Sequence, residues 1–316
     1  MTKPNCRYVF GPVPSRRLGR SLGLDLVPFK TCSFDCIYCQ LGRTTCRTIA
    51  RKEYVPLSDI LSQLWRKLEG GERPDYITLS GSGEPTLHSE IGKLIKAIKH
   101  KSAIPVAVLT NGSLLWDEAV RADLLPADLV VPSLDAGDEA LFQKINRPAP
   151  ELKFDQVVEG LSLFRKEYSG QLWLEVFLVN NINTSAPALD RIKKCAERIV
   201  ADKLQLNTVI RPPAEGWAER VPDAEMARIC DFFENAEVIT PYGRHPAEPE
   251  QQRVTEEVLA LLRRRPCTLE DISKGLGIHR NEAVKHLQKL LEENLLHQVL
   301  RDGVLYYQVK SSVTHE

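Results

Sequence analysis

The sequence lacks any apolar run of the length that a membrane span needs. A spanning helix takes about 20 predominantly apolar residues, and the apolar stretch LWLEVFLV (172–179) is short and interrupted by Glu175. The N-terminal stretch MTKPNCRYVFGPVPSRR also has no apolar segment of the kind found in a secretory signal. From these two absences we expect a cytoplasmic protein.

The chain has no net charge, because 42 Lys and Arg residues balance 42 Asp and Glu residues. The charges are unevenly spread, however. Residues 1–52 hold ten basic and two acidic residues, a net charge of +8, whereas residues 53–249 carry a net charge of −8. The basic segment contains three clustered cysteines. Its field therefore favours an anionic ligand there, although a solvated basic surface would have the same composition.

Cysteine is too sparse for a disulfide-stapled scaffold, with eight in 316 residues. Three fall in KTCSFDCIYCQLG (30–42) with the spacing C-x3-C-x2-C, whereas structural zinc sites and ordinary cubane clusters take four ligands. Either three thiolates hold three irons of a [4Fe–4S] cluster whose fourth iron stays open, or zinc takes Cys46 or a histidine as its fourth ligand. The scattered cysteines are expected to be small buried apolar residues: Cys6, Cys46, Cys195, Cys230 and Cys267.

Short β-like runs alternate with amphipathic helical runs from residue 24 to about 240. The predicted strands cover 24–27, 76–80, 105–110, 128–134, 172–179 and 204–210. The predicted helices between them include 58–70, with Ser58 as the capping residue and Gly70 and Gly71 as the stop. Six successive βα units predict an α/β fold with a parallel sheet over residues 1–239, either open and doubly wound or curled into part of a barrel.

The pattern changes after TPYGRHPAEPEQQ (240–252), whose three prolines and one glycine predict a linker. Residues 253–316 then read as a helix, a short helix, a turn, a longer helix over 279–294 and a hairpin that turns at Asp302-Gly303. This order predicts a small C-terminal winged helix-turn-helix domain. Its recognition helix carries both signs of charge. Nucleic-acid binding and docking to a protein or to the rest of the chain therefore both stay open.

The cysteine spacing, with Tyr38 just before its last member, resembles the signature of the radical S-adenosylmethionine (radical SAM) superfamily. ITLSGSGEPTL (77–87) is similar to that family's glycine-rich turn after its second strand, except that Ser82 stands where a glycine usually lies. TNGS (110–113) and PSLDA (132–136) resemble the polar ends of the third and fourth strands. The resemblance extends over about residues 8–215 and implies a partial (β/α)6 barrel.

The resemblance also implies cofactors and their ligands. Cys32, Cys36 and Cys39 would hold a [4Fe–4S] cluster, and S-adenosyl-L-methionine (SAM) would fill the fourth position. A reduced flavodoxin or ferredoxin would donate the electron that cleaves SAM, and the resulting radical would take a hydrogen atom from the substrate. Arg211 would contact a carboxylate of SAM, of the substrate or of the protein. The other residues expected to contact SAM are Tyr38, Gly81, Ser82, Gly83, Glu84, Asn111, Ser133 and Asp135.

The segment PVPSRRLG (12–19) resembles a group of iron–sulfur oxidoreductases usually placed beside the wyosine-forming tRNA enzymes. Its arginines, with the next one along, are expected to contact an anionic substrate: Arg16, Arg17 and Arg20. The leading hypothesis is hydrogen abstraction from a nucleotide or an RNA base. The alternatives are radical chemistry on a peptide, protein or small metabolite, and a non-enzymatic iron–sulfur or zinc regulator that binds DNA. The sequence assigns no catalytic residue.

Overall fold

A single sheet organises the larger part of the chain in the computed structural model, which describes residues 8–210, 213–239, 249–301 and 304–310. The sheet has eight strands in the order β1-β2-β5-β6-β7-β8-β9-β10. Strand β1 is antiparallel to β2, and the following strands are parallel to their neighbours. The bounds are β1 Val9–Ser15, β2 Gly19–Asp25, β5 Tyr76–Ser80, β6 Val106–Thr110, β7 Leu129–Pro132, β8 Gln171–Leu178, β9 Lys203–Thr208 and β10 Ala236–Val238.

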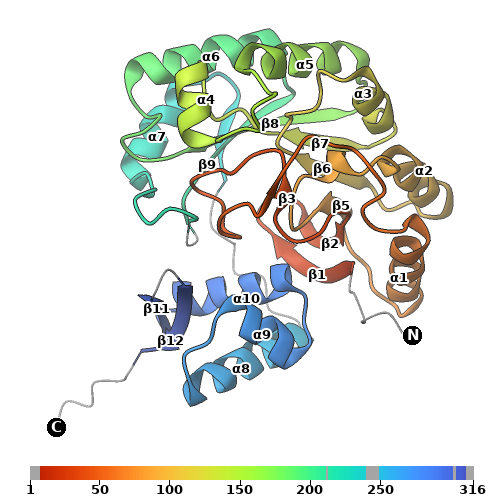
Figure 1. Cartoon of the computed structure of the whole chain (residues 1–316), viewed down its shortest axis with the longest axis vertical. Helices are drawn as coiled ribbons and strands as arrows, with labels where there is room; N and C mark the ends of the chain where they lie inside the picture. The colour runs from red at the N-terminus through yellow and green to blue at the C-terminus, as the bar shows by residue number, and fades with distance from the viewer. Residues whose placement is uncertain (1–7, 211–212, 240–248, 302–303, 311–316) are drawn as a thin grey trace.

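Helices connect the parallel strands and lie along the outside of the sheet (Figure 1). Their apolar stripes pack on the strands to form the main core. The helices are α1 Leu57–Glu69, α2 Ile91–Lys101, α3 Glu118–Leu124, α4 Glu139–Ile145, α5 Phe154–Glu167, α6 Ala186–Ile199 and α7 Asp223–Phe232. The predicted capping role of Ser58 is wrong, because α1 begins at Leu57 with Pro56 at its cap position and no side-chain cap.

The sheet is curled rather than flat. Arg17, in the turn between β1 and β2, pairs with Glu175 on β8, and Arg16 donates to the side-chain oxygen of Asn207 on β9 at 3.2 Å. In a flat sheet β8 would lie four strand spacings from β2, about 19 Å. Side chains bridge that span because the inner face is concave, as in a partial barrel. The doubly wound alternative is therefore wrong.

Apolar residues occupy one end of the curled sheet, and polar loops occupy the other. At the end where the parallel strands begin, Leu18 packs with Ala107, Leu129 and Val131 into a buried apolar cluster. At the end where they finish, the loops carry the cysteines and the other polar motifs. A two-stranded ribbon of β3 (Thr31–Cys32) and β4 (Cys46–Arg47) anchors the cysteine loop there. This is the rim at which parallel α/β folds bind ligands.

The C-terminal part has its own hydrophobic core and lies beside β1 (Figure 1). It consists of α8 Pro249–Arg264, α9 Leu269–Leu276, α10 Arg280–Glu292 and the hairpin β11 Leu296–Arg301 with β12 Val304–Val309. We call it the C-terminal unit. Helix α8 begins at Pro249, inside the predicted linker. The predicted hairpin turn, Asp302-Gly303, falls outside the described residues, and the winged-helix interpretation stays a prediction.

Candidate active site

The three clustered cysteines follow β2 on the loop at the carboxyl end of the sheet, and all three are half-buried. Each sulfur faces a hydrogen-bond donor, which suits a thiolate better than a neutral thiol. The side-chain contacts are Lys30 Nζ to Cys39 Sγ at 3.2 Å, Asn111 Nδ2 to Cys32 Sγ at 3.5 Å and Asn146 Nδ2 to Cys36 Sγ at 3.6 Å. The donors come from three different parts of the chain, so the loop is held in place around its sulfurs.

The chemistry of these thiols fits an iron–sulfur cluster. Burial raises the pKa of Cys32 to about 12, and it raises that of Cys36 well above the ordinary value. Such thiols release their protons when a metal binds. Within the described residues, no three His, Cys, Asp or Glu side chains are arranged to hold one metal ion. Cubane ligands each bind a different iron, so three cysteines on one loop suit a cluster.

The remaining cysteines are not gathered at this loop. Cys195 and Cys267 are buried and Cys230 is half-buried, broadly as expected for small apolar residues. Cys46 is exposed on β4, which corrects the expectation that it is buried. Cys6 lies outside the described residues.

The turn after β5, Gly81–Glu84, packs directly against the segment that leads into the cysteine loop. The amide of Ser82 donates to Asp25 Oδ1 at 2.5 Å, and its hydroxyl donates to Asp25 Oδ2 at 2.7 Å. The amide of Lys30 donates to the Ser82 carbonyl at 2.6 Å. A Cβ on Gly81, whose φ is +111°, would lie 1.8 Å from Asp25 Oδ1. Glycine is required there by the close approach as well as by the backbone conformation.

Glu84 ends that turn as a buried carboxylate, with 2% of its surface exposed. Its Oε1 accepts from the amide and hydroxyl of Thr86 and from the hydroxyl of Thr110, at 3.0, 2.6 and 2.6 Å. Its Oε2 accepts from the amide of Asn111 at 2.8 Å. Burial raises the pKa of Glu84, and its charge in turn raises the pKa of Cys32. The carboxylate thus lies near the cysteines, with Oε2 less heavily bonded than Oε1.

Two contacts hold the side chain of Tyr38 against the carboxyl end of the sheet. Its ring stacks on Phe177 with centroids 3.8 Å apart, and its hydroxyl donates to Asp135 Oδ2 at 2.5 Å. Asp135 also accepts from Asn146 Nδ2 at 2.6 Å and from the Phe177 amide at 3.0 Å. Burial raises the pKa of Asp135 to about 6. These internal contacts give Asp135 a part in positioning Tyr38, which sequence reasoning missed.

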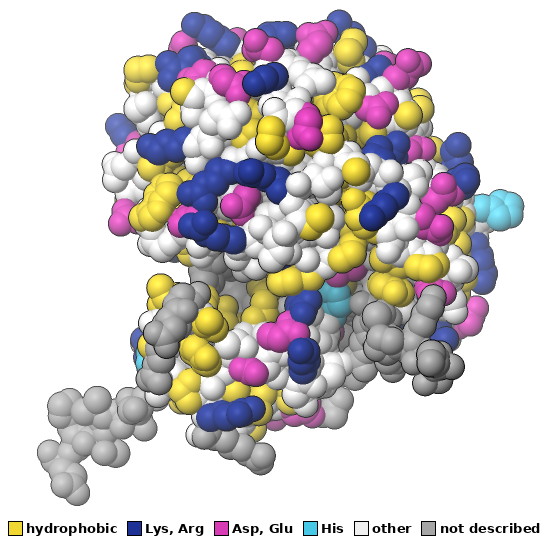
Figure 2. All heavy atoms as spheres, viewed as in Figure 1, with side chains coloured by type: hydrophobic (Ala, Val, Ile, Leu, Met, Phe, Trp, Pro, Cys, Tyr) yellow, Lys and Arg dark blue, Asp and Glu magenta, His cyan; other side chains and the backbone are white. Residues whose placement is uncertain are grey.

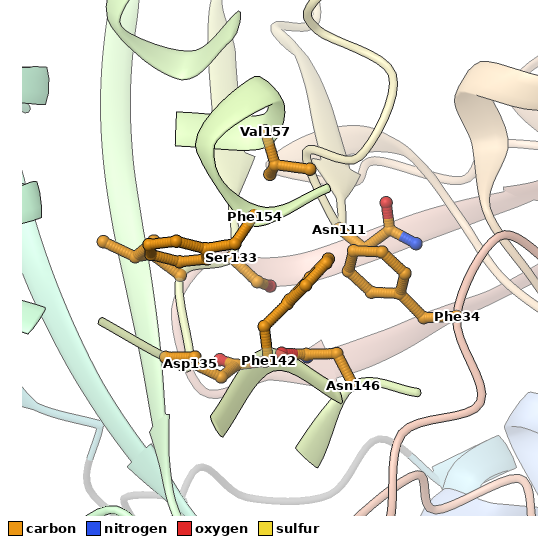
Figure 3. Close-up of a pocket in the computed structure, with 10 residues that line it drawn as sticks. Phe34, Asn111, Ser133, Asp135, Phe142, Asn146, Phe154 and Val157 are labelled. Atoms are coloured by element: carbon orange, nitrogen blue, oxygen red, sulfur yellow. Dashed lines mark hydrogen bonds between the residues drawn. The ribbon is translucent and has the colours of Figure 1, made fainter. Parts of the chain in front are cut away.

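A small cavity separates this network from the helices outside it (Figure 3). Its volume is about 10 Å³, room for roughly one water molecule. Asn111 and Ser133 contribute polar atoms from the strand ends, while Phe142 and Phe154 bring apolar rings from α4 and α5. The predicted strand-end residues Asn111, Ser133 and Asp135 are therefore brought together around one space.

A family model of the radical SAM superfamily matches residues 26–188, just over half of the chain. The chain belongs to the radical SAM superfamily. Members are enzymes that bind a [4Fe–4S] cluster and SAM, so this chain is a radical SAM enzyme with those two cofactors. The zinc-site and non-enzymatic regulator interpretations are thereby set aside.

Two curated relatives match nearly the full length of this radical SAM chain, and a third matches about half of it. It is 34% identical over 305 residues to a UPF0026 protein of Methanocaldococcus jannaschii, with 94% of each chain covered. It is also 40% identical over 312 residues to a protein named GTPase Obg from Brachyspira hyodysenteriae, but the chain spans only 46% of that protein's length. A probable GTP 3′,8-cyclase of Saccharolobus islandicus is 32% identical over 147 residues, covering 46% of this chain and 44% of that protein.

Solved radical SAM structures share the fold. A radical SAM methyltransferase from Sphaerobacter thermophilus superimposes with a TM-score of 0.55 at 15% identity, covering 71% of this chain and 67% of the other. SuiB from Streptococcus suis, solved with its precursor peptide SuiA, gives 0.51 at 17% identity over 69% of this chain and 48% of the other. At these identities the likeness concerns the barrel and not the substrate.

The arginines expected at the substrate do not lie together in this radical SAM enzyme. Arg20 lies at the start of β2, where its amide donates to Asp75 and its guanidinium lies 3.7 Å from Glu72. Asp25, at the other end of that strand, is about 17 Å further along. Arg16 and Arg17 reach into the curled sheet, and Glu175, the partner of Arg17, forms a β-bridge with the strand-end residue Ser133. Their contact with a substrate stays a prediction, and Arg211 lies outside the described residues.

A different group of arginines surrounds the cysteine loop. Arg43 and Arg147 both pair with Glu215, at 2.7 and 2.5 Å, and Arg47 donates to the carbonyl of Arg147 at 3.2 Å. Figure 2 shows Lys and Arg side chains gathered on the face where Figure 1 places the loop around β3. Arg43 and Arg47 belong to the basic N-terminal segment, but sequence alone could not indicate that Arg147 joins them.

Proposed function

We propose that Cys32, Cys36 and Cys39 ligate the cluster of this radical SAM enzyme and that Gly81–Glu84 receives the methionine portion of SAM. When bound, the two cofactors supply one-electron cleavage of SAM to methionine and a 5′-deoxyadenosyl radical, which takes a hydrogen atom from the substrate. The observation that carries the assignment is the buried Glu84 carboxylate beside sulfurs that each face a donor.

The residues of the chain bind and orient in this proposal. Glu84 pairs with the ammonium group of SAM, and its desolvated position strengthens a charge-assisted contact. Asn111 and Ser133 offer polar groups from the strand ends, whereas Asp135 acts through Tyr38 because its oxygens already accept three hydrogen bonds. The apolar cluster around Leu18, at the opposite end of the sheet, keeps water from reaching the site from that end.

We further propose a cytoplasmic enzyme that takes its electron from a reduced flavodoxin or ferredoxin. Among the described residues, no helix is long and apolar enough to cross a membrane. The exposed guanidiniums of Arg43 and Arg47 beside the cysteine loop suit an anionic partner.

The proposed substrate is a nucleotide or an RNA base. Two observations support it: the arginines around the cysteine loop, and the partial similarity to a probable GTP 3′,8-cyclase. Guanidinium groups recognise phosphate with paired hydrogen bonds. We add Arg43, Arg47 and Arg147 to Arg16 and Arg17 as candidates for contact with the anionic group of the substrate.

An anaerobic experiment tests this function. The protein is reconstituted with iron and sulfide, reduced, mixed with SAM, and followed by EPR and by mass spectrometry of 5′-deoxyadenosine. Cys36→Ala is expected to lose the four-iron cluster and all SAM cleavage, because one iron loses its thiolate. Cys46→Ala, a matched change on the neighbouring exposed strand β4, is expected to keep both.

An intact cluster in Cys36→Ala, or its loss in Cys46→Ala, would contradict the ligand assignment. The same assay with GTP, transfer RNA and short peptides added in turn tests the substrate. We expect 5′-deoxyadenosine formation to rise with one of the first two, together with loss of the parent nucleotide or base. Consumption of a peptide alone would refute the nucleotide proposal.

A further inference from the structure

Helix α10 of the C-terminal unit begins against the barrel, at the strand end that carries the SAM turn. His279 is its N-cap, and the Nε2 atom of His279 lies 2.6 Å from Asp25 Oδ2. Both side chains are almost completely buried, with 10% and 8% of their surfaces exposed. The imidazole also stacks on Phe10 of β1, with centroids 4.4 Å apart and ring planes within 10°.

The hydrogen bonds of His279 assign its neutral tautomer. The amide of Asn281 donates to His279 Nδ1 at 3.1 Å as part of the helix cap. The proton of the neutral ring is therefore on Nε2, which donates it to Asp25. One side chain thus caps α10 and contacts the barrel at the same time.

Asp25 connects His279 to the turn after β5 through hydrogen bonds. Its two oxygens hold the amide and hydroxyl of Ser82, and the Ser82 carbonyl accepts from the amide of Lys30. Lys30 in turn donates from its ammonium group to Cys39 Sγ. A chain of hydrogen bonds therefore connects the first turn of α10 with both the SAM turn and the cysteine loop.

A second contact holds the same helix end to the same barrel segment. The guanidinium of Arg280 lies 4.1 Å from the ring centroid of Phe29, one residue before Lys30, and its Nε donates to Glu270 on α9 at 2.6 Å. The first residues of a recognition helix read base edges in a helix-turn-helix protein. Here those residues contact the barrel instead.

We propose that His279 is a positioning residue for SAM binding, and that the C-terminal unit completes the SAM site of the barrel. The proposal rests on the proposed role of Gly81–Glu84 in holding SAM. His279 fixes the rotamer of Asp25, and Asp25 fixes the turn whose backbone and Glu84 carboxylate receive the methionine portion. The Asp25 carboxylate makes its hydrogen bonds to His279 and Ser82 stronger than bonds between neutral groups.

The test uses the full-length reconstituted protein and His279→Asn. Asparagine is a good N-cap and keeps the acceptor for Asn281, but it is too short to reach Asp25. We expect SAM affinity, measured by titrating the SAM-dependent change in the EPR signal of the reduced cluster, to fall on the order of tenfold, the lower range for a hydrogen bond to a charged group. Iron and sulfide contents should stay unchanged.

Three further variants show whether an effect of His279→Asn comes from its contact with Asp25. His279→Gln, whose amide can reach Asp25, should recover most of the affinity. His297→Asn makes the same change on β11, at the other end of the unit (Figure 1), and should bind SAM like the parent protein. Glu84→Ala tests the turn itself and should lose SAM affinity with the cluster intact.

The outcomes separate the two proposals. If Glu84→Ala weakens SAM binding and His279→Asn does not, His279 is no positioning residue and the SAM site stands. If neither variant changes the affinity, the SAM-site assignment fails. If His279→Asn loses its cluster or its fold and His279→Gln does so too, the histidine has a structural role and the proposal is overturned.

Discussion

Lys30 is a buried lysine whose ammonium group lies 3.2 Å from the Sγ atom of Cys39, one of the proposed cluster ligands. A cation and a hydrogen bond at a thiolate both stabilise the extra electron of a reduced cluster. Lys30→Met is therefore expected to make the reduction potential of the cluster more negative, by an amount on the order of tens of millivolts. Redox titration followed by EPR measures the shift.

Lys93→Met provides the control for that substitution. Lys93 is exposed on α2, with 72% of its side chain accessible, so its loss should leave the potential unchanged. An unchanged potential in Lys30→Met, with full cluster content, would show that the ammonium group does not tune the cluster.

At the scale of elements, the turn after β5 is held by close backbone packing. A Cβ on Gly83 would lie 1.8 Å from the carbonyl oxygen of Thr31, the residue before the first cysteine. Gly83→Ala must push the turn away from the cysteine loop. We expect it to lower the free energy of unfolding by about 1–3 kcal/mol, the usual cost of overpacking, and urea unfolding measures this.

Gly216→Ala is the matched control, because a Cβ at Gly216 would meet no atom within 4 Å. Its free energy of unfolding should stay close to that of the parent protein. Equal stability of the two variants would mean that the turn is looser than its packing indicates.

At the scale of the whole molecule, acid should weaken the C-terminal unit. His286 on α10 is 8% exposed and shares a hydrogen bond with Thr255 on α8 at 2.8 Å. Burial, with a smaller effect of Lys289, lowers its pKa to about 4. Below pH 6.5 His286 takes up a proton in the unfolded chain, whereas in the folded unit it stays neutral until the pH approaches 4. Stability therefore falls as the pH drops from 6.5 to 4, by about 1.4 kcal/mol per pH unit.

His286→Gln removes this titration and should flatten the fall in stability between pH 7 and pH 5. Urea unfolding followed by circular dichroism at both values measures the difference. His100→Gln, an exposed histidine on α2, should keep the pH dependence of the parent protein. Parallel curves for the parent and His286→Gln would contradict the prediction.

The sequence predicted most of the parallel strands and helices because their patterns are local. The run 76–80 coincides with β5, and the predicted helix 58–70 lies within one residue of α1. Strand β10 was missed, and the first parallel strand was expected at 24–27 rather than at Gly19–Asp25. Strand β1 was missed because VFGPVPS, with two prolines and a glycine, reads as a loop. It forms as an antiparallel edge strand that pairs with β2, and only the tertiary structure supplies that partner.

The candidate site was predictable where its residues share a motif and was missed where they meet only in space. The clustered cysteines were predicted from their spacing, and the turn up to Glu84 from its resemblance to the family's glycine-rich turn; both assignments stay proposals. Asp25, which holds that turn, has no motif of its own, and His279 is 254 residues further along the chain. Its only sequence signal was a position at the start of a predicted helix.

The pairing of Arg17 with Glu175, beside the apolar cluster around Leu18, stops the inner space of the barrel at one end. The cysteine loop lies at the opposite end of the parallel strands. We therefore expect SAM and the substrate to enter from the side of that loop.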